Sequence, residues 1–342
     1  MTSTTNPRVA PWHIDESEFF EIEGSRAQKE FLVRYAVLAP SGHNTQPWSF
    51  TIDGDEIAVH PDYSRRLPVA DPTDRELMLS IGAAVTNLRV AAAHFGFEST
   101  VLYEPTDDRP SPVAVITLRE TCNPDEDLRK LFPAITRRHT ARSDFDARGI
   151  EPEILDQLCA FVEHSEMTRF ILPQERARAA TLVEEADQLL MHNDEWRSEL
   201  AAWVRPNESS AADGIPADAF GIPGPLSAFA PWLIRSIDMG ATQAKRDRQL
   251  MEHAAGMIVV TSDDDRVALL RAGEALERLL LFLTSLHVQY AFMNQVIQVP
   301  QLRRELWKVI RTPKPPQLLI RIGYSDIRQR AMPRRSVDSV VG

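Results

Sequence analysis

The chain has 342 residues, 43% of them hydrophobic, which is enough for one large domain or two ordinary domains with a substantial core. The formal net charge of -11 argues against nucleic acid or an anionic membrane surface as the main partner. Only Cys122 and Cys159 are present, and the nine histidines lack metal-ligand spacing. These features exclude a disulfide framework, argue against a metal site and favour a reducing, cytoplasmic location.

The N-terminal segment, residues 1–26, is predicted to be a tail. Residues 1–11 are polar and lack the apolar core of a signal peptide. The most apolar run of the chain, residues 279–286, is interrupted by Thr284 and Ser285 and is too short to span a bilayer. We therefore expect no membrane partner.

Residues 39–50 combine more conformationally special residues and hydrogen-bonding side chains than any other stretch: Ala-Pro-Ser-Gly-His-Asn-Thr-Gln-Pro-Trp-Ser-Phe. The apolar spacing of residues 31–39 predicts a helix that ends before Pro40, because proline disfavours helical geometry in the preceding residue. Residues 48–52 have the pattern of a strand. The polar residues between them lie at a junction that often carries function. A capped loop that merely joins two elements is the alternative.

Further elements follow from periodicity. The pair Asp53-Gly54 predicts a tight hairpin that returns through residues 57–60. Apolar residues at helical spacing predict a long helix over about 74–94, and a continuous apolar run predicts a buried strand over 112–118. The same patterns predict helices over 154–162 and 302–310 and a strand over 316–322.

The chain also contains an internal repeat. A shift of 191 residues places residues 71–88 over residues 262–279 without a gap, and six of the eighteen positions are then identical. Helical periodicity alone aligns some apolar residues, but Gly82/Gly273 does not belong to a core pattern, so we favour a duplicated unit. The identical pairs are Asp74/Asp265, Arg75/Arg266, Leu79/Leu270, Gly82/Gly273, Ala84/Ala275 and Leu88/Leu279.

The predicted organisation is therefore a first repeat over residues 27–125 and a second over 126–342, folded against each other as a pseudo-dimer within one chain. The halves differ in their motifs. Residues 163–169 of the second half show no trace of the turn found in the first half. Residues 136–142, Thr-Arg-Arg-His-Thr-Ala-Arg, have no counterpart in the first half.

The arginines of residues 136–142 form a basic cluster in an otherwise acidic chain. Their guanidinium groups, with the Thr140 hydroxyl, suit a phosphate monoester. The alternative is a solvated basic face that balances nearby acids. Further basic residues close to the C-terminal end are Arg328, Arg330, Arg334 and Arg335.

Residues 39–48 resemble the Ala-Pro-Ser-x-x-Asn-x-Gln-Pro-Trp signature of the FMN-dependent nitroreductase family. The twin-repeat chain resembles the Acg-like branch, whose members end in a tail similar to residues 332–336. This resemblance covers the chain from about residue 27. It implies an α+β, nitroreductase-like FMN-binding fold with two tandem repeats that form an intramolecular pseudo-dimer.

The resemblance also implies which residues bind FMN. In the family, an Arg-Arg-Ser-type motif and terminal basic residues hold the phosphate, and the Pro-Ser-x-x-Asn turn approaches the isoalloxazine ring. Arg138 and Thr140 match the phosphate-binding arginine and hydroxyl residue, with Arg137 and Arg142 as helpers, and Arg334 and Arg335 match the terminal basic pair with looser spacing. The matching turn residues are Pro40, Ser41, Gly42 and Asn44, with Gln46 in support of the turn. Further candidates are Asn294 and Gln295, with buried capping amides as the alternative.

Each half carries a motif that the other half lacks, so one FMN per chain is expected. Residues 205–232 contain five prolines and three glycines together with large apolar residues. A connection of this length and composition predicts a lid-like insertion, residues 205–240, that packs over the flavin.

The implied function is an FMN-dependent oxidoreductase that transfers electrons from NAD(P)H to a nitroaromatic, a quinone or a similar planar acceptor. The flavin N5 carries the chemistry, so no catalytic side chain is assigned, although His43 and His139 are candidates for proton transfer. The alternative is a protein that stores or shields FMN under its lid with little NAD(P)H turnover. A duplicated structural protein with surface arginines is the third reading. We expect no metal, and the pseudo-dimer within one chain is compatible with a monomer or with further pairing of chains.

Overall fold

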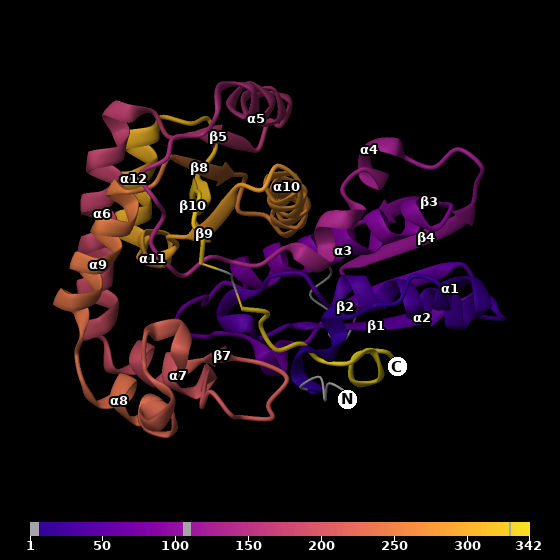
Figure 1. Ribbon diagram of the computed structural model, residues 1–342, viewed down its shortest axis with the longest axis horizontal. Coiled ribbons are helices and arrows are strands. Elements are labelled where there is room, and N and C mark those ends of the chain that lie inside the picture. Colours follow the sequence, from indigo (N-terminus) through magenta and orange to yellow (C-terminus); the bar gives the residue numbers. More distant parts are fainter. Residues whose placement is uncertain (1–6, 105–110, 328–329) are drawn as a thin grey trace.

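The computed structural model describes residues 7–104, 111–327 and 330–342 (Figure 1). Arg328, one of the predicted basic residues, lies outside these ranges. The first half contains a four-stranded antiparallel sheet with the strand order β1-β2-β4-β3. Its strands are β1 (Trp48–Asp53), β2 (Glu56–Pro61), β3 (Phe97–Leu102) and β4 (Ala114–Glu120).

The predicted hairpin is confirmed. Asp53 of β1 pairs with Glu56 of β2, and Gly54 between them has a φ of 51°, a left-handed conformation that glycine adopts without steric cost. β1 follows the turn that ends helix α2 (Ser25–Ala36).

The second half contains another four-stranded antiparallel sheet, with the order β5-β8-β10-β9. Every residue of its two central strands is buried, which agrees with their largely apolar sequences. Taken in chain order, its strands are arranged as in the first sheet. They are β5 (Thr168–Phe170), β8 (Gly256–Thr261), β9 (Gln289–Phe292) and β10 (Pro316–Gly323).

The two halves meet at the long helices α3 (Arg75–His94) and α10 (Arg266–Ser285). A Cβ atom on Gly82 would collide with the carbonyl oxygen of Leu270, and one on Gly273 would collide with that of Leu79. The contact is reciprocal between the residues that the repeat places in equivalent positions, as at a twofold axis. It supports the duplication, which stays a prediction.

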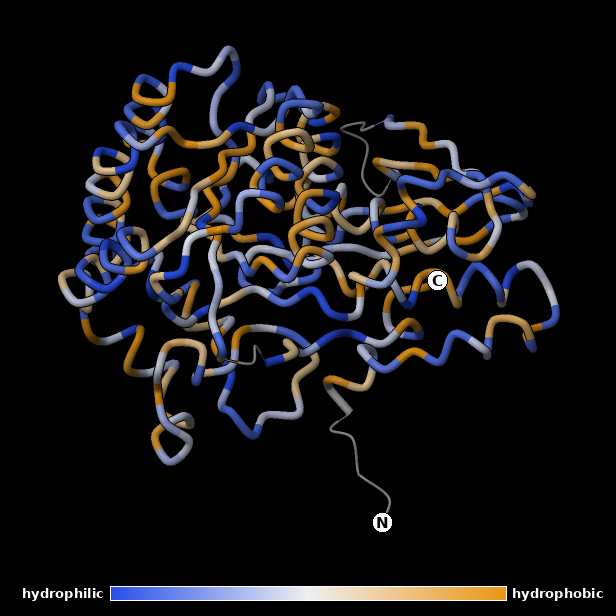
Figure 2. The backbone as a smooth tube through the Cα atoms, turned by 45° about the horizontal axis from the view of Figure 1, so that its top comes forward, coloured by the Kyte–Doolittle hydropathy of each residue, from blue (hydrophilic) through white to orange (hydrophobic). Residues whose placement is uncertain are grey.

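Helix α3 has the length and hydropathy of a membrane-spanning helix, but it is a core helix with nearly all of its residues buried. The coloured trace agrees with this arrangement, since hydrophobic segments gather inside and the outer helices alternate between hydrophobic and hydrophilic residues (Figure 2).

The connection between β5 and β8 is a large insertion, residues 171–255, which we call the insertion (Figure 1). The predicted insertion, residues 205–240, is its central part, and it is structured rather than an irregular lid. The insertion packs with α11 (Gln295–Gln298) and α12 (Pro300–Ile310) around a second hydrophobic core. Its main elements are α6 (Pro173–His192), α7 (Asp194–Trp203), β6 (Val204–Arg205), β7 (Ile215–Pro216), α8 (Ala230–Ser236) and α9 (Gly240–Glu252).

The predicted N-terminal tail is wrong for the segment from Trp12 onward. Trp12 and Phe19 are buried, and the Phe19 ring lies 4.3 Å from the Phe95 ring between centroids. The Trp12 indole donates a hydrogen bond of 2.8 Å to the Met332 carbonyl. The two aromatic rings bury enough apolar surface to hold this segment on the core.

Candidate functional site

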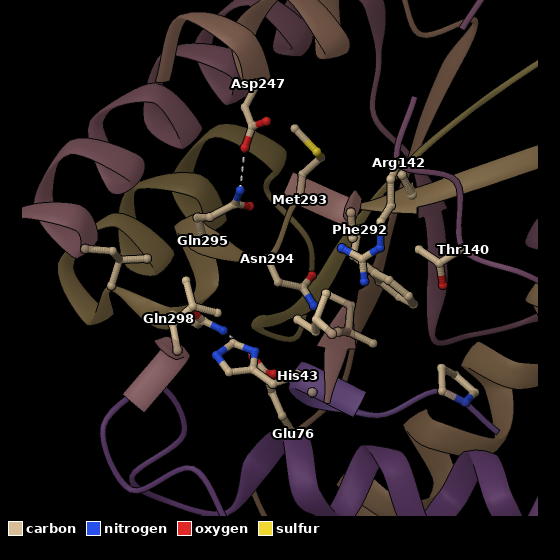
Figure 3. A pocket seen from close by; sticks show the side chains of 18 of the residues that line it. His43, Glu76, Thr140, Arg142, Asp247, Phe292, Met293, Asn294, Gln295 and Gln298 are labelled. Atoms are coloured by element: carbon tan, nitrogen blue, oxygen red, sulfur yellow. Dashed lines mark hydrogen bonds between the residues drawn. The ribbon is translucent and has the colours of Figure 1, made fainter. Parts of the chain in front are cut away.

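A cavity of about 300 Å³ lies where the two halves and the insertion meet (Figure 3). This volume is at the lower end of the range for small-molecule sites. The first half contributes the turn at residues 40–43 and part of α3. The second half contributes residues 140–142 and the segment 291–298, and the insertion contributes α6, α7, α9 and the residues after β7.

The turn has an unusual backbone. His43, Asn44 and Gln46 have φ angles of 48°, 56° and 53°, a left-handed region that side chains with a Cβ atom rarely adopt. The backbone N–H of Gln46 donates a hydrogen bond of 2.9 Å to the Ser41 hydroxyl, which closes the turn. Such strain persists only where surrounding contacts enforce it, and it is common at functional sites. Here it directs His43 toward the cavity (Figure 3).

Asn44 and Gln46 supply the contacts that enforce the turn, and neither lines the cavity. The Asn44 amide donates to the carbonyls of Gly214 at 2.9 Å and Pro333 at 3.0 Å. The Gln46 amide donates to the Ala212 carbonyl at 2.8 Å. The two side chains therefore tie the turn to the insertion and to the C-terminal segment.

Arg138 and Arg334, two predicted phosphate ligands, are buried in contacts with the protein and do not line the cavity. Both donate to the Leu38 carbonyl, at 2.7 Å and 3.1 Å. Arg138 also pairs with the buried Glu277 at 3.1 Å. Burial raises the pKa of Glu277 to about 7, against the attraction of the two arginines, and burial lowers the pKa of Arg334 to about 9.

The remaining predicted arginines are Arg137, Arg142 and Arg335, and of these Arg142 alone lines the cavity. Arg137 is exposed and donates to the Pro133 carbonyl, whereas Arg335 donates to the carbonyls of Gln46 and Trp48. The predicted residues that line the cavity are Pro40, Ser41, Gly42, Thr140 and Arg142, with Asn294 and Gln295. The predicted residues that do not line it are Asn44, Gln46, Arg137, Arg138, Arg334 and Arg335.

Two cavity arginines, Arg246 on α9 and Arg321 on β10, were missed from the sequence. The signal for Arg321 was a charged residue inside a strand that is otherwise strongly apolar. Its side chain is 1% exposed, and one guanidinium nitrogen donates to the Ser143 carbonyl at 2.8 Å. Its Nε and Nη1 have no hydrogen-bond partner among the described residues. Unsatisfied cationic donors at a cavity wall suit a ligand with anionic or carbonyl oxygens.

Burial lowers the pKa of several basic groups at the cavity. It lowers the pKa of Arg142 and of Arg321 to about 10 each, so both stay protonated at neutral pH. Burial, reinforced by the Arg142 charge, lowers the pKa of His43 to about 4. His43 is therefore a neutral imidazole at pH 7. His139, the other proton-transfer candidate, lies against the Trp12 ring at 4.6 Å between centroids and does not line the cavity.

Three acids line the cavity: Glu76 on α3, Asp187 on α6 and Asp247 on α9. Glu76 accepts hydrogen bonds of 3.1 Å from Arg75 and from Gln298. Burial raises the pKa of all three carboxyls. Within the described ranges, no group of three or more His, Cys, Asp and Glu side chains could hold a metal ion.

Comparison with known proteins finds relatives that are similar over most of the chain. No family model matches it. The chain is 27% identical over 318 residues to the putative NAD(P)H nitroreductase Acg of Mycobacterium tuberculosis, covering 90% of this chain and 93% of that protein. It is 28% identical over 320 residues to a second putative NAD(P)H nitroreductase of that organism, covering 90% and 88%.

Among solved structures, a putative nitroreductase from Anabaena variabilis matches with a TM-score of 0.47 and 13% identity, covering 91% of both chains. The FMN-dependent nitroreductase NfnB of Mycobacterium smegmatis, solved with NADPH, matches with a TM-score of 0.36 and 13% identity, covering 63% of this chain and 92% of NfnB. The mycobacterial relatives confirm the resemblance, seen in residues 39–48, to the Acg-like branch of the nitroreductase superfamily.

Proposed function

We propose that this chain is an FMN-dependent oxidoreductase that transfers electrons from NAD(P)H to a planar acceptor such as a quinone or a nitroaromatic. The observation that carries the proposal is the cavity, which combines apolar walls with the guanidinium groups of Arg142, Arg246 and Arg321. An aromatic ring system with an anionic chain matches that combination. The mycobacterial relatives, named putative NAD(P)H nitroreductases, support it.

The cavity residues fit FMN by their chemistry. Arg142, Arg321 and the Thr140 hydroxyl would bind its phosphate or its carbonyl oxygens. Gly42 lets the turn backbone lie close to Glu76 at the cavity wall, because a Cβ atom there would lie 3.0 Å from a Glu76 carboxylate oxygen. Bound FMN would supply two-electron transfer between NAD(P)H and the acceptor.

The protein's own groups would tune that chemistry. The cavity arginines would supply positive charge to a bound ring, and such charge stabilises the negative charge that reduction creates. Trp196 of α7 and Phe220 after β7 add apolar surface from the insertion, which would keep water away from the ring. The insertion is thus proposed to cover the flavin as a fixed wall of the cavity.

We also infer that the two halves act as the two subunits of a pseudo-dimer. The equal strand order of the two sheets and the reciprocal contact of Gly82 with Gly273 support this. The turn comes from one half and the cavity arginines from the other, so one chain would hold one FMN.

Anaerobic mixing of the FMN-loaded protein with NADPH, and separately with NADH, tests the proposed function. We expect rapid loss of the oxidised-flavin absorbance with at least one of them and its return when a quinone is added. Free FMN at the same concentration is the control. A spectrum that neither NADPH nor NADH changes would contradict the proposal and support storage of FMN instead.

A further inference from the structure

Two acids occupy helix positions that belong to the hydrophobic core. Asp187 of α6 lies in the buried stripe with Val183 and Leu190, and Asp247 of α9 lies in the buried stripe with Ala244. Their exposed fractions are 3% and 4%. Aspartate is almost never buried to this extent without a partner, because desolvation of its charge is costly. The burial therefore calls for a chemical reason.

The two carboxyl groups are neighbours, since the charge of Asp247 contributes to the raised pKa of Asp187. The Asp187 Oδ2 atom is buried and has no hydrogen-bond partner among the described residues. A proton shared between the two carboxyls would satisfy that atom. Amides rather than cations complete the arrangement, since Gln295 donates to Asp247 at 2.6 Å (Figure 3) and Gln243 donates to it at 2.9 Å. Neither acid makes an ion pair within the described part of the chain. Two carboxyls in contact without a bound cation do not both ionise.

The surroundings keep that proton in place at neutral pH. Burial, and then the neighbouring Asp247 carboxylate, raises the pKa of Asp187 to about 9. Glu184 on α6 acts in the same direction, whereas Arg246 on α9 and Arg321 on β10 favour the charge on Asp247. A pair in this environment retains a proton at pH 7.

Both acids line the cavity assigned above to the flavin and the acceptor. We propose that Asp187 and Asp247 form a carboxyl pair that shares one proton and gives it to the acceptor during its reduction. This inference rests on the proposed function and extends it to acceptors that take up protons, with quinones as the class best suited.

The proton balance explains the need for such a pair. NAD(P)H, a quinone and one proton give NAD(P)⁺ and a hydroquinone. The hydride carries two electrons and one hydrogen to the acceptor, and the second proton leaves the carboxyl pair for a quinone oxygen. The pair regains its proton from water. His43 does not hold a proton to give at neutral pH, because burial keeps its imidazole neutral.

The test compares two acceptors in the FMN-loaded Asp187→Asn variant. Benzoquinone takes up protons on reduction, whereas ferricyanide takes only electrons. We expect kcat with benzoquinone to fall about 100-fold, the lower range for loss of general acid catalysis, and the ferricyanide rate to be unchanged. In the unsubstituted protein, the ratio of the benzoquinone rate to the ferricyanide rate should fall as pH rises through about 9, and the variant should lack this fall.

A second measurement does not depend on turnover. The infrared difference spectrum between the unsubstituted protein and Asp187→Asn at pH 7 should contain the carbonyl band of a protonated carboxylic acid. Glu185→Gln is the matched control, because Glu185 is an exposed acid on the same helix. It should keep the band and both rates. If Asp187→Asn does not fold, as judged by circular dichroism, Asp247→Asn serves for the same measurements.

Absence of the carbonyl band from the difference spectrum would overturn the proposal. Equal loss of both acceptor rates would also overturn it, because a merely structural pair would slow the two alike. A normal benzoquinone rate in Asp187→Asn would refute the role of the pair alone. If the unsubstituted protein oxidised no NAD(P)H even with ferricyanide, the proposed function itself would fail.

Discussion

The two sheets have the same strand order and differ most at one connection. In the first sheet, β1 and β2 are joined by the turn at Gly54 and Asp55, whereas in the second, β5 and β8 are joined by residues 171–255. A hairpin turn at the surface tolerates long insertions, because loop-closure entropy grows slowly with length. The second sheet thus keeps the strand order of the first, and the helices of the insertion form a wall of the cavity.

The halves also divide the work at the cavity. The first half supplies the strained turn and no cavity arginine, whereas the second half supplies Arg142, Arg246 and Arg321. This asymmetry agrees with the proposal that two similar halves form a single FMN site. The predictions below test what each half contributes, beginning with the largest effect.

Arg138 is expected to link the halves, since it belongs to the second half and binds the Leu38 carbonyl of the first. Arg138→Met removes one partner of the buried ion pair with Glu277, so we expect the free energy of unfolding in urea to fall by about 3 kcal/mol. The control is Arg26→Met in the first half, whose Arg26–Glu30 pair is exposed and should contribute less than about 1 kcal/mol. Equal losses in the two variants would contradict the linking role.

The glycines at the crossing of α3 and α10 test the reciprocity of the contact. Gly82→Ala and Gly273→Ala each place a methyl group against backbone atoms, so each should lower the free energy of unfolding by about 2 kcal/mol. Gly149→Ala is the control, because its Cβ atom would meet open space. A large loss at only one of the two glycines would show that the halves are not equivalent there.

Arg142 lines the cavity and Arg137 lies at the surface, so substitutions of these two residues test which part of the basic cluster binds FMN. Arg142→Gln should weaken FMN binding by about 1.5 kcal/mol, roughly tenfold in Kd, through loss of a charged hydrogen bond. Arg137→Gln should leave the affinity unchanged, because Arg137 is exposed. Titration of flavin fluorescence measures both. If the Arg137 variant were the weaker binder, the cavity would be assigned to the wrong arginine.

The strained turn gives the smallest effect. His43→Gly removes the steric cost of the left-handed conformation, roughly 1–2 kcal/mol. Glycine also adds roughly 0.5–1 kcal/mol of unfolded-state entropy, which opposes that gain. Thermal unfolding should show a gain below about 1 kcal/mol. His287→Gly relieves the same strain away from the cavity and should gain as much. Only the His43 variant should change NAD(P)H oxidation, and an equal change in both would remove His43 from the site.

Local patterns predicted much of the fold. The helix expected over residues 74–94 is α3, the strand expected over 316–322 is β10, and the Asp53-Gly54 hairpin is present. These elements follow from periodicity and turn chemistry, which act over a few residues. The insertion was predicted too short, because its helices have the same amphipathic pattern as helices of the frame.

The site was harder to predict, because charge in a sequence does not reveal where a side chain is buried. Arg138 and Arg142 are four residues apart, yet one is enclosed by Glu277 and Leu38 and the other lines the cavity. The proposed pairing of Asp187 with Asp247 involves two helices, so it has no local sequence pattern. The signal that existed was a polar residue at a core position, as for Arg321 in β10.

The flavin content of the purified chain tests the account most directly. Release of the flavin by denaturation, with its absorbance compared with the protein concentration from amino-acid analysis, gives the number of FMN molecules per chain. We predict one, because the turn and the cavity arginines occur once each. Two FMN per chain, or a colourless protein that binds no added FMN, would contradict a single site built from two unequal halves.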